Sequence, residues 1–269
     1  RRHPQSDEFI ISAACEMITE FKPDLLAIHP AAVDGARHRS GLFSEEVNAS
    51  LDDTERWTMQ LIEATKKAGV FEETNFAIIS DHGQLEIKRS INLNVLFKEK
   101  GYIRTDNNGG FIDYDAYCKS AGMSVQVYLK NPSNMALHDE IYELLSGLRD
   151  EGVYGISEVF TRSEAYEKEH LYGGFSFVLE TDGYTSFGND WNRPLVRSFD
   201  LSDYRFGHAT HGYLPDKGPQ PTAIFCGPDF KKGVEISRRN IVDLAPTFAR
   251  LLGTGLPKAD GKVIDEVLK

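Results

Sequence analysis

Cysteine is scarce in this sequence, with three in 269 residues, and Cys15, Cys118 and Cys226 are far apart and lack CxxC spacing. An odd number of isolated cysteines excludes a disulfide framework and a zinc site made of thiolates. This favours a reducing compartment, and we expect a cytoplasmic protein. No window approaches the ~18 consecutive apolar residues that a membrane span requires, so we expect no membrane span in this chain.

Positive charge is also in short supply. The chain has 30 Lys and Arg residues against 41 Asp and Glu residues, which gives a formal net charge of −11. A broad basic surface for nucleic acid is therefore not expected, since such surfaces neutralise backbone phosphates with Lys and Arg. A small anionic substrate is not excluded, because a bound metal ion can reverse the local field. The sequence has no internal repeats, and its length suits one large domain or one domain with an insertion.

Helical and strand patterns alternate in the first part of the chain. Amphipathic periodicity predicts helices over residues 6–21 and 45–68. Short apolar runs predict buried parallel strands over residues 24–29 and 75–80. This alternation is typical of an α/β protein with a parallel sheet.

The middle of the chain has a different pattern. Extended segments begin at Ser124 and Phe175, and a helix is predicted near 136–150. We interpret residues 96–204 as an inserted mixed α+β cap subdomain, although these two strands also fit the main sheet. Residues 1–95 and 205–269 then form an α/β metal-binding core. In its C-terminal part we predict a strand at TAIFCG and a helix over 240–252 that Gly253 ends.

Acidic and histidine side chains lie beside the predicted core strands, where ligands of open α/β sheets bind. The residues are Asp34, His38, Asp81, His82, His208 and His211. Asp34 and His38 are four residues apart, a spacing that puts both on one face of a helical turn. Gly83 allows a sharp turn directly after His82. Each element alone also fits a simpler interpretation, as a turn, a solvated loop or a hydrogen-bonded histidine.

Taken together, these residues indicate a metal site. All donors are oxygen or nitrogen and none is sulfur, as in open catalytic zinc sites and paired-metal sites. The set exceeds what one open catalytic zinc needs, so two metal ions are the natural interpretation.

Three stretches of the chain resemble a known family. They are PDLLAIHPAAVDGARHRSG, TNFAIISDHGQ and THGYLPDKGPQPTAIFCGPDFKKG, and they resemble the type I phosphodiesterase / nucleotide pyrophosphatase family of the alkaline phosphatase superfamily. The resemblance extends over most of residues 20–95 and 205–260 and is loose between them. It implies an alkaline-phosphatase-like, parallel-rich sheet flanked by helices. It also implies hydrolysis of phosphodiester or pyrophosphate bonds.

The resemblance also implies a ligand set for two zinc ions, with another divalent metal such as manganese as an alternative. Asp34, His38 and His211 would hold one ion, and Asp81 and His82 would hold part of the second. His211 is preferred to His208 because it stands directly before glycine in the HGY-like motif. His208 would then have a supporting or structural role.

One part of the family pattern is not found. In the family, an upstream strand supplies a further aspartate, and a nearby Thr or Ser acts as the nucleophile. Here 33 residues precede Asp34, and they are predicted to form one helix and one strand. We therefore expect this chain to correspond to the C-terminal two-thirds of such an enzyme, without the nucleophile and the N-terminal part of the core. It would bind one zinc well, hydrolyse its substrate slowly and self-associate through exposed sheet edges.

Two other classes of function remain open. One is a different member of the superfamily, namely a phosphomonoesterase, phosphonate hydrolase, phosphomutase or sulfatase. The other is a metal-binding or interaction module with impaired or no catalysis. If the protein is an enzyme of either the phosphodiesterase family or another branch of the superfamily, the expected partner is a small phosphate ester such as a nucleotide.

Several side chains are candidates for binding such a substrate. Tyr172, Tyr184 and Trp191 could stack on a nucleobase, although packing of the insertion is the simpler interpretation. Four cations could contact a phosphate or lie on a solvated surface, and they are Arg37, Lys217, Lys231 and Lys232.

Overall fold

The chain folds into two compact units. The computed structural model describes residues 3–198 and 207–269. Unit 1 consists of Arg1–Ala32, Ala49–Asp81 and Pro221–Lys269, and unit 2 consists of Val33–Asn48 and His82–Gln220. The division into a core and a cap of residues 96–204 stays a prediction, and its boundary at 204 to 205 lies outside the described residues.

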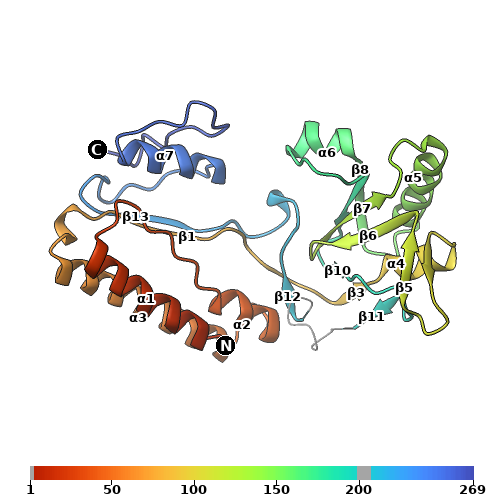
Figure 1. Cartoon of the computed structure of the whole chain (residues 1–269), viewed down its shortest axis with the longest axis horizontal. Coiled ribbons are helices and arrows are strands. Elements are labelled where there is room, and N and C mark those ends of the chain that lie inside the picture. Colours follow the sequence, from red (N-terminus) through yellow and green to blue (C-terminus); the bar gives the residue numbers. More distant parts are fainter. Residues whose placement is uncertain (1–2, 199–206) are drawn as a thin grey trace. The chain divides into compact units, whose positions relative to one another are not determined.

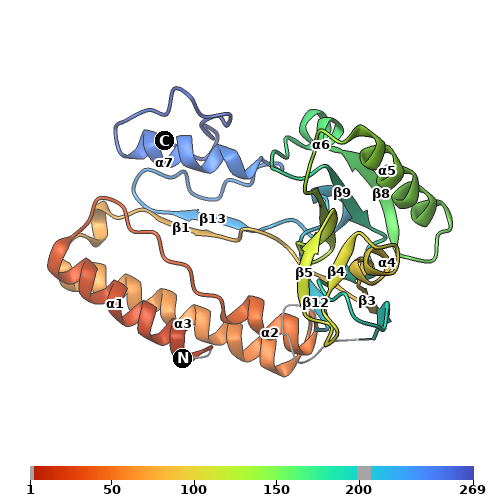
Figure 2. The same ribbon diagram turned by 45° about the vertical axis from the view of Figure 1, so that its right-hand side comes forward.

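Two long helices form the first half of unit 1. Helix α1 (Gln5–Phe21) and helix α3 (Glu45–Ala68) lie side by side in both views (Figures 1 and 2). Ile11 and Trp57 are buried together between them, because the apolar positions of each helix recur on one face. Both helices match the predicted ranges, which confirms this part of the sequence analysis.

The C-terminal part of unit 1 contains one strand and one α-helix within the described residues. A 3-10 turn, η4 (Ile241–Asp243), leads into α7 (Leu244–Leu251), and Gly253 follows with a φ of 69°. This positive φ is the left-handed conformation in which helices commonly end, as predicted. A second 3-10 turn, η1 (Phe71–Glu73), follows α3.

The strands of unit 1 differ from the prediction in their pairing. Strands β1 (Phe76–Ile79) and β13 (Ala223–Cys226) form a two-stranded antiparallel sheet, in which Ile78 lies opposite Ile224. Both strands were predicted, but the expected parallel pairing and burial are wrong for β1, because three of its four residues are exposed. The predicted strand over residues 24–29 is also wrong. These described residues form no strand, and Leu25 is 61% exposed. An apolar run becomes a strand only where a neighbouring strand accepts its backbone hydrogen bonds.

A four-stranded antiparallel sheet is the centre of unit 2. Its order is β6 (Ala116–Ser120), β7 (Ser124–Leu129), β9 (Phe177–Thr181) and β8 (Ile156–Thr161). The predicted strands at 124 and 175 are thus confirmed, and they pair with each other rather than with β1. The helix predicted near 136–150 is α5 (Met135–Asp150).

Helix α5 closes the core of unit 2 against this sheet. Its residues Ile141 and Leu145 are fully buried in one cluster with Val127, Phe177 and Leu179 of the strands. Alternate residues of β7 face this cluster, as expected for a strand with one buried face. Burial of large apolar side chains of this kind is the main stabilising contribution to such a unit.

Apart from the elements that carry the candidate site, which are described below, the remaining elements of unit 2 are short. The helices are α4 (Leu93–Glu99), α6 (Arg162–Glu169) and the 3-10 turn η3 (Pro215–Lys217). The strands are β3 (Arg89–Ile91), β4 (Ile103–Thr105), β5 (Phe111–Tyr114), β10 (Thr185–Phe187) and β11 (Val196–Arg197). Strand β3 pairs in parallel with β10 and antiparallel with β11, and β4 pairs with β5.

The mixture of helices and sheets confirms the α/β class. The expected parallel-rich sheet is wrong for residues 3–198 and 207–269, where the pairing of β3 with β10 is the one parallel pair of named strands. No helix in this described part of the chain is long and apolar enough to cross a membrane.

Candidate metal centre

Helix α2 (Ala32–Ser40) carries two of the predicted ligands, Asp34 and His38. Their spacing of one helical turn brings His38 Nε2 to 3.3 Å from Asp34 Oδ1. The His38 side chain is 1% exposed, and its Nδ1 lies 2.6 Å from the carbonyl oxygen of Ala209. Because a carbonyl only accepts hydrogen bonds, Nδ1 carries the proton. Nε2 faces Asp34: when it is protonated it donates to the carboxylate, and when it is deprotonated it can bind a metal ion, which is the arrangement used by metal-binding histidines.

A short antiparallel pair brings two further histidines together. Strand β2 (Leu85–Glu86) pairs with β12 (Ala209–Thr210), with Leu85 opposite Thr210. Continuing this register by one residue places His211 beside the turn that contains His82. Their rings are stacked, with centroids 3.8 Å apart and an interplanar angle of 20°.

Gly83 of this turn is required by close packing. A Cβ atom at this position would lie 2.2 Å from the carbonyl oxygen of Pro219 and 2.8 Å from the Tyr213 hydroxyl. Any larger residue would have to displace the backbone. The sequence predicted a sharp turn at Gly83. The chain bends at Asp81 instead, and close packing rather than a positive φ is the reason for glycine at position 83.

The segment that carries His211 is anchored to the four-stranded sheet. The carbonyl oxygen of His211 accepts a hydrogen bond from the Met123 amide at 2.9 Å. Gly212 follows with a φ of 88°, and a Cβ there would lie 2.0 Å from the carbonyl oxygen of Ala121. Two residues later, the Leu214 amide donates to Glu180 Oε1 at 2.9 Å. These contacts fix the backbone from which His211 projects.

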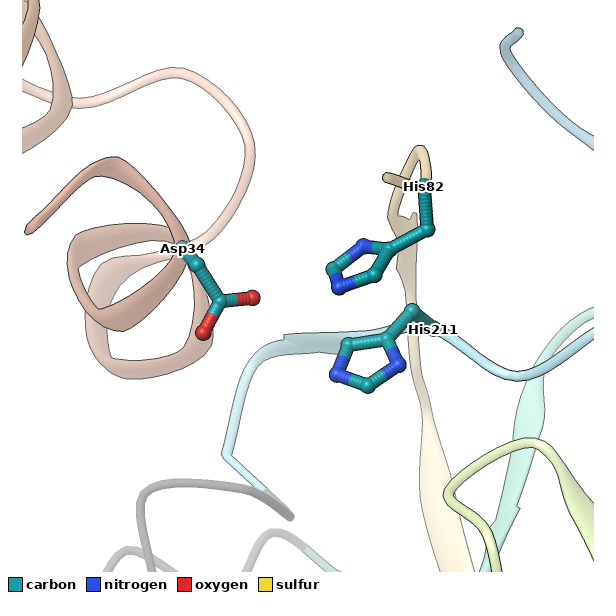
Figure 3. A group of neighbouring side chains, drawn as sticks. All are labelled: Asp34, His82 and His211. Carbon is teal, nitrogen blue, oxygen red and sulfur yellow. The ribbon is translucent and has the colours of Figure 1, made fainter. Parts of the chain in front are cut away.

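Asp34, His82 and His211 form a group that can hold a metal ion. One carboxylate oxygen and two ring nitrogens lie within 4.8 Å of one another. Figure 3 shows the carboxylate of α2 and the two imidazole rings on facing sides of the same space. Donors that share a zinc ion through bonds of ~2.0–2.1 Å lie at most about 4 Å apart, so only small side-chain movements are needed. Three protein donors of this type fit an open zinc or manganese site.

The electrostatics of the group favour an ionised Asp34. Burial raises the pKa of this carboxyl group, but the hydrogen bond and charge of His38, with the charges of His211 and His82, lower it more. The net result is a pKa below the ordinary value. An ionised carboxylate is the form that binds a cation.

The structure groups the predicted ligands differently from the sequence analysis. It brings His82 to Asp34 and His211, whereas the resemblance assigned His82 to a second ion with Asp81. His38 borders the same group, with its ring centroid 5.3 Å from that of His211. Asp81 is exposed and is the last residue of the second segment of unit 1. The assignment of individual ligands to one or two ions stays a prediction.

His208 contributes through its backbone. Its amide donates to the carbonyl oxygen of His38 at 2.7 Å, and its own carbonyl oxygen accepts from Ile87 at 3.0 Å. These two bonds tie the end of α2 to the strand pair. The supporting or structural role of the His208 side chain stays a prediction.

The candidate substrate-binding residues of the insertion lie in different surroundings. Tyr172 and Tyr184 are 74% and 61% exposed, and the Arg162 guanidinium lies over the Tyr172 ring. Trp191 packs against the core of unit 2, and its Nε1 donates to the carbonyl oxygen of Gly109 at 2.9 Å. Packing is therefore a sufficient explanation for Trp191.

The four candidate phosphate-binding cations also differ in their surroundings. Lys217 lies 3.3 Å from Glu180, and Lys231 donates to two backbone carbonyl oxygens. Lys232 is exposed. Arg37 is half-buried on α2, and its Nε is buried without a hydrogen-bond partner within the described residues.

Two polar residues of the site were missed by the sequence analysis. Gln84 directly follows the SDHG motif and donates to Asp34 Oδ1 at 2.6 Å. Glu180 is 3% exposed within β9, and burial is the main reason that its pKa is raised. In the sequence, Gln84 could have been noticed only because it directly follows the SDHG motif. Glu180 could have been noticed because it is a charged residue within an otherwise apolar strand.

A family comparison gives a match over most of the chain. The family model of the type I phosphodiesterase / nucleotide pyrophosphatase family matches residues 4–214. This range contains all five predicted metal ligands. A comparison with curated proteins gave no match.

The fold is similar to that of solved ectonucleotide pyrophosphatases. Human ectonucleotide pyrophosphatase / phosphodiesterase 5 is 19% identical, with a TM-score of 0.71, and the similarity covers 97% of this chain and 63% of that one. The murine protein, solved as an inactive variant in complex with AMP, is 19% identical with a TM-score of 0.68 and the same coverage. The alkaline-phosphatase-like fold is thus confirmed, and the chain spans 63% of the length of these relatives.

Proposed function

The chain belongs to the type I phosphodiesterase / nucleotide pyrophosphatase family, and from that membership we propose that the protein is a metal-dependent hydrolase of phosphodiester or pyrophosphate bonds. The observation that carries the proposal is the convergence of Asp34, His82 and His211 within one compact unit. Their carboxylate and imidazole donors match the open sites that metallohydrolases use.

The residues of this chain would hold the metal and fix its position. Asp34, His82 and His211 would supply the first donors, and His38 would add a further nitrogen next to Asp34. A divalent ion bound there would neutralise negative charge on the phosphoryl oxygens of a substrate. The buried hydrogen bond from His38 to Ala209 keeps the imidazole ring in one orientation.

The finer parts of the proposal follow the family pattern. Asp81 would join a second set of ligands, so that the complete site would hold two zinc ions. The nucleophile and one further ligand would come from a segment outside this chain, in agreement with its 63% coverage of solved relatives. The substrate would be a nucleotide or a similar phosphate ester, a proposal supported by the AMP bound to the murine relative. A cytoplasmic location remains a prediction that rests on the free thiols of Cys15, Cys118 and Cys226.

Metal content tests the proposal most directly. We expect about one zinc per chain by elemental analysis after purification without chelator, since three protein donors suffice for an open site. His211→Ala should remove most of this zinc, because it deletes one of the three converging donors. His29→Ala is the matched control, since His29 is exposed and lies in unit 1. Folded protein without zinc or manganese, even after addition of either metal, would contradict the proposal.

Substrate preference separates the proposed activity from the alternatives. We expect the zinc-loaded chain to hydrolyse bis(p-nitrophenyl) phosphate faster than p-nitrophenyl phosphate, at a rate well below the ~1 to 1,000 per second of ordinary enzymes. A preference for the monoester would favour a phosphomonoesterase. Retained zinc without turnover of either compound would favour a metal-binding module.

A further inference from the structure

Gln84 connects the two sides of the metal centre. It lies two residues after His82, at the start of β2, and is 3% exposed. Its Nε2 donates to Asp34 Oδ1 at 2.6 Å and lies 3.4 Å from the Asp34 carbonyl oxygen. The turn that carries His82 and the helix that carries Asp34 are therefore joined by a short, charge-assisted hydrogen bond.

The other end of the same amide is unsatisfied. Within the described residues, Gln84 Oε1 is buried and has no hydrogen-bond partner. A buried acceptor without a partner destabilises the folded state, whereas an apolar side chain of the same length would avoid this cost. Packing alone therefore does not account for glutamine at this position. The donor end provides the reason, because an apolar side chain of this length would offer the Asp34 carboxylate no hydrogen-bond donor.

His38 also contacts Asp34, but it restrains the carboxylate in a different way. His38 Nε2 is 3.3 Å from the same oxygen, and it approaches from the same helix one turn away. Gln84 approaches from a different element, so it restrains the carboxylate relative to His82. A ligand set gains affinity when its members are held in place before the metal arrives.

We propose that Gln84 is a positioning residue that holds the Asp34 carboxylate in the orientation in which it binds the metal. This inference rests on the proposed function, because it requires that Asp34 binds a metal ion. Gln84 itself does not contact the metal or the substrate in this role.

The substitution Gln84→Met separates positioning from packing. Methionine keeps the length of the side chain and removes both the N–H donor and the unsatisfied acceptor. We expect the zinc affinity, measured by calorimetric titration of the apoprotein, to fall by ~10- to 100-fold, as for other residues that support a metal ligand. The melting temperature measured in EDTA should stay equal or rise, because the buried acceptor is gone. A merely structural residue would lower both quantities together.

Two further variants sharpen the test. Gln84→Glu should weaken zinc binding at least as much as Gln84→Met, since it replaces the donor by a second carboxylate beside Asp34. Gln126→Met is the matched control, because Gln126 is half-buried on β7 and its Oε1 accepts from the Tyr128 hydroxyl. The control should keep the wild-type zinc affinity.

The possible results are distinguishable. Zinc affinity of Gln84→Met within threefold of the wild type would overturn the role of Gln84 and leave the proposed function intact. A joint loss of affinity and of melting temperature in EDTA would also overturn it in favour of a structural role. Absence of zinc and manganese binding by the wild-type chain itself would overturn the proposed function, and the inference with it.

Discussion

Strands β9 and β1 have opposite surroundings, although β1 is the more apolar of the two in sequence. Strand β9 of unit 2 lies between β7 and β8, and all five of its residues are buried. Strand β1 of unit 1 has β13 as its one partner within the described residues, and three of its four residues are exposed. The comparison teaches that burial of a strand depends on its neighbours on both edges and on cover over its faces, and not on its apolar content.

The two units also differ in how their helices are used. In unit 2, Ile141 and Leu145 of α5 join the cluster formed by the strands. In unit 1, Ile11 of α1 and Trp57 of α3 are buried against each other in a separate, smaller cluster. The sheet and the helices therefore contribute to one core in unit 2 and to separate clusters in unit 1.

The largest effect is expected from a cavity in the core of unit 2. Phe177 is fully buried in the cluster that contains Leu145 and Leu179. We expect Phe177→Ala to lower the free energy of unfolding by about 3–5 kcal/mol, the range for aromatic residues truncated in a core. Urea denaturation monitored by circular dichroism measures this loss.

The control for this substitution lies in unit 1. Phe21 at the end of α1 is 77% exposed, so Phe21→Ala should change the free energy of unfolding by no more than about 0.5 kcal/mol. Equal losses for the two variants would mean that exposure in this structure does not describe the protein in solution. The distinction between the two units would then fail.

A smaller effect is expected from Gly212, which lies next to the metal centre. Its φ is 88°, and an added Cβ would lie 2.0 Å from the carbonyl oxygen of Ala121. Gly212→Ala should therefore displace the backbone that carries His211. We expect a loss of stability above the ~1–2 kcal/mol that a left-handed conformation alone costs a non-glycine residue, together with weaker zinc binding.

Gly233 of unit 1 separates the cost of the left-handed conformation from the effect of close packing. Its φ is 67°, and an added Cβ would meet no atom within 4 Å. Gly233→Ala should therefore show the conformational cost of about 1–2 kcal/mol and unchanged zinc binding. If Gly212→Ala behaves like Gly233→Ala in both measurements, the close approach to Ala121 is not needed for the site.

Local patterns predicted the longest helices and several of the strands but little of their pairing. The helices over 6–21 and 45–68 and the strands at 124 and 175 were predicted, because amphipathic periodicity depends on nearby residues. The antiparallel partner of β1 lies almost 150 residues away in sequence, and no local signal identifies it. The run over residues 24–29 shows the limit most clearly, since its apolar residues form no strand within the described part of the chain.

The site was predicted to a similar extent. The sequence predicted that Asp34, His82 and His211 belong to a metal site, because the motifs that contain them resemble a family. The reasoning from strand ends holds for His82, which follows β1, but not for Asp34, since residues 24–29 form no strand. The sequence did not predict that His82 lies next to Asp34, since this depends on the pairing of β2 with β12. Gln84 could not be identified from the sequence either, because its contact with Asp34 joins residues 50 positions apart.

The smallest effect on stability, and a clear effect on association, is expected at the exposed sheet of unit 1. Ile78 and Ile79 of β1 and Ile224 of β13 are 44%, 45% and 53% exposed. Exposed apolar strands with open edges promote pairing between molecules, and a charged side chain on the strand opposes it. We expect the wild-type chain to self-associate in sedimentation velocity experiments as concentration rises, and Ile224→Lys to reduce the associated fraction. The free energy of unfolding should change by no more than about 0.5 kcal/mol, because Ile224 is exposed.

The matched control is Phe43→Lys in unit 2, where Phe43 is 90% exposed outside any strand. A monomeric wild type at all concentrations, or an equal reduction by Phe43→Lys, would show that the sheet of unit 1 is not the surface through which the chains associate.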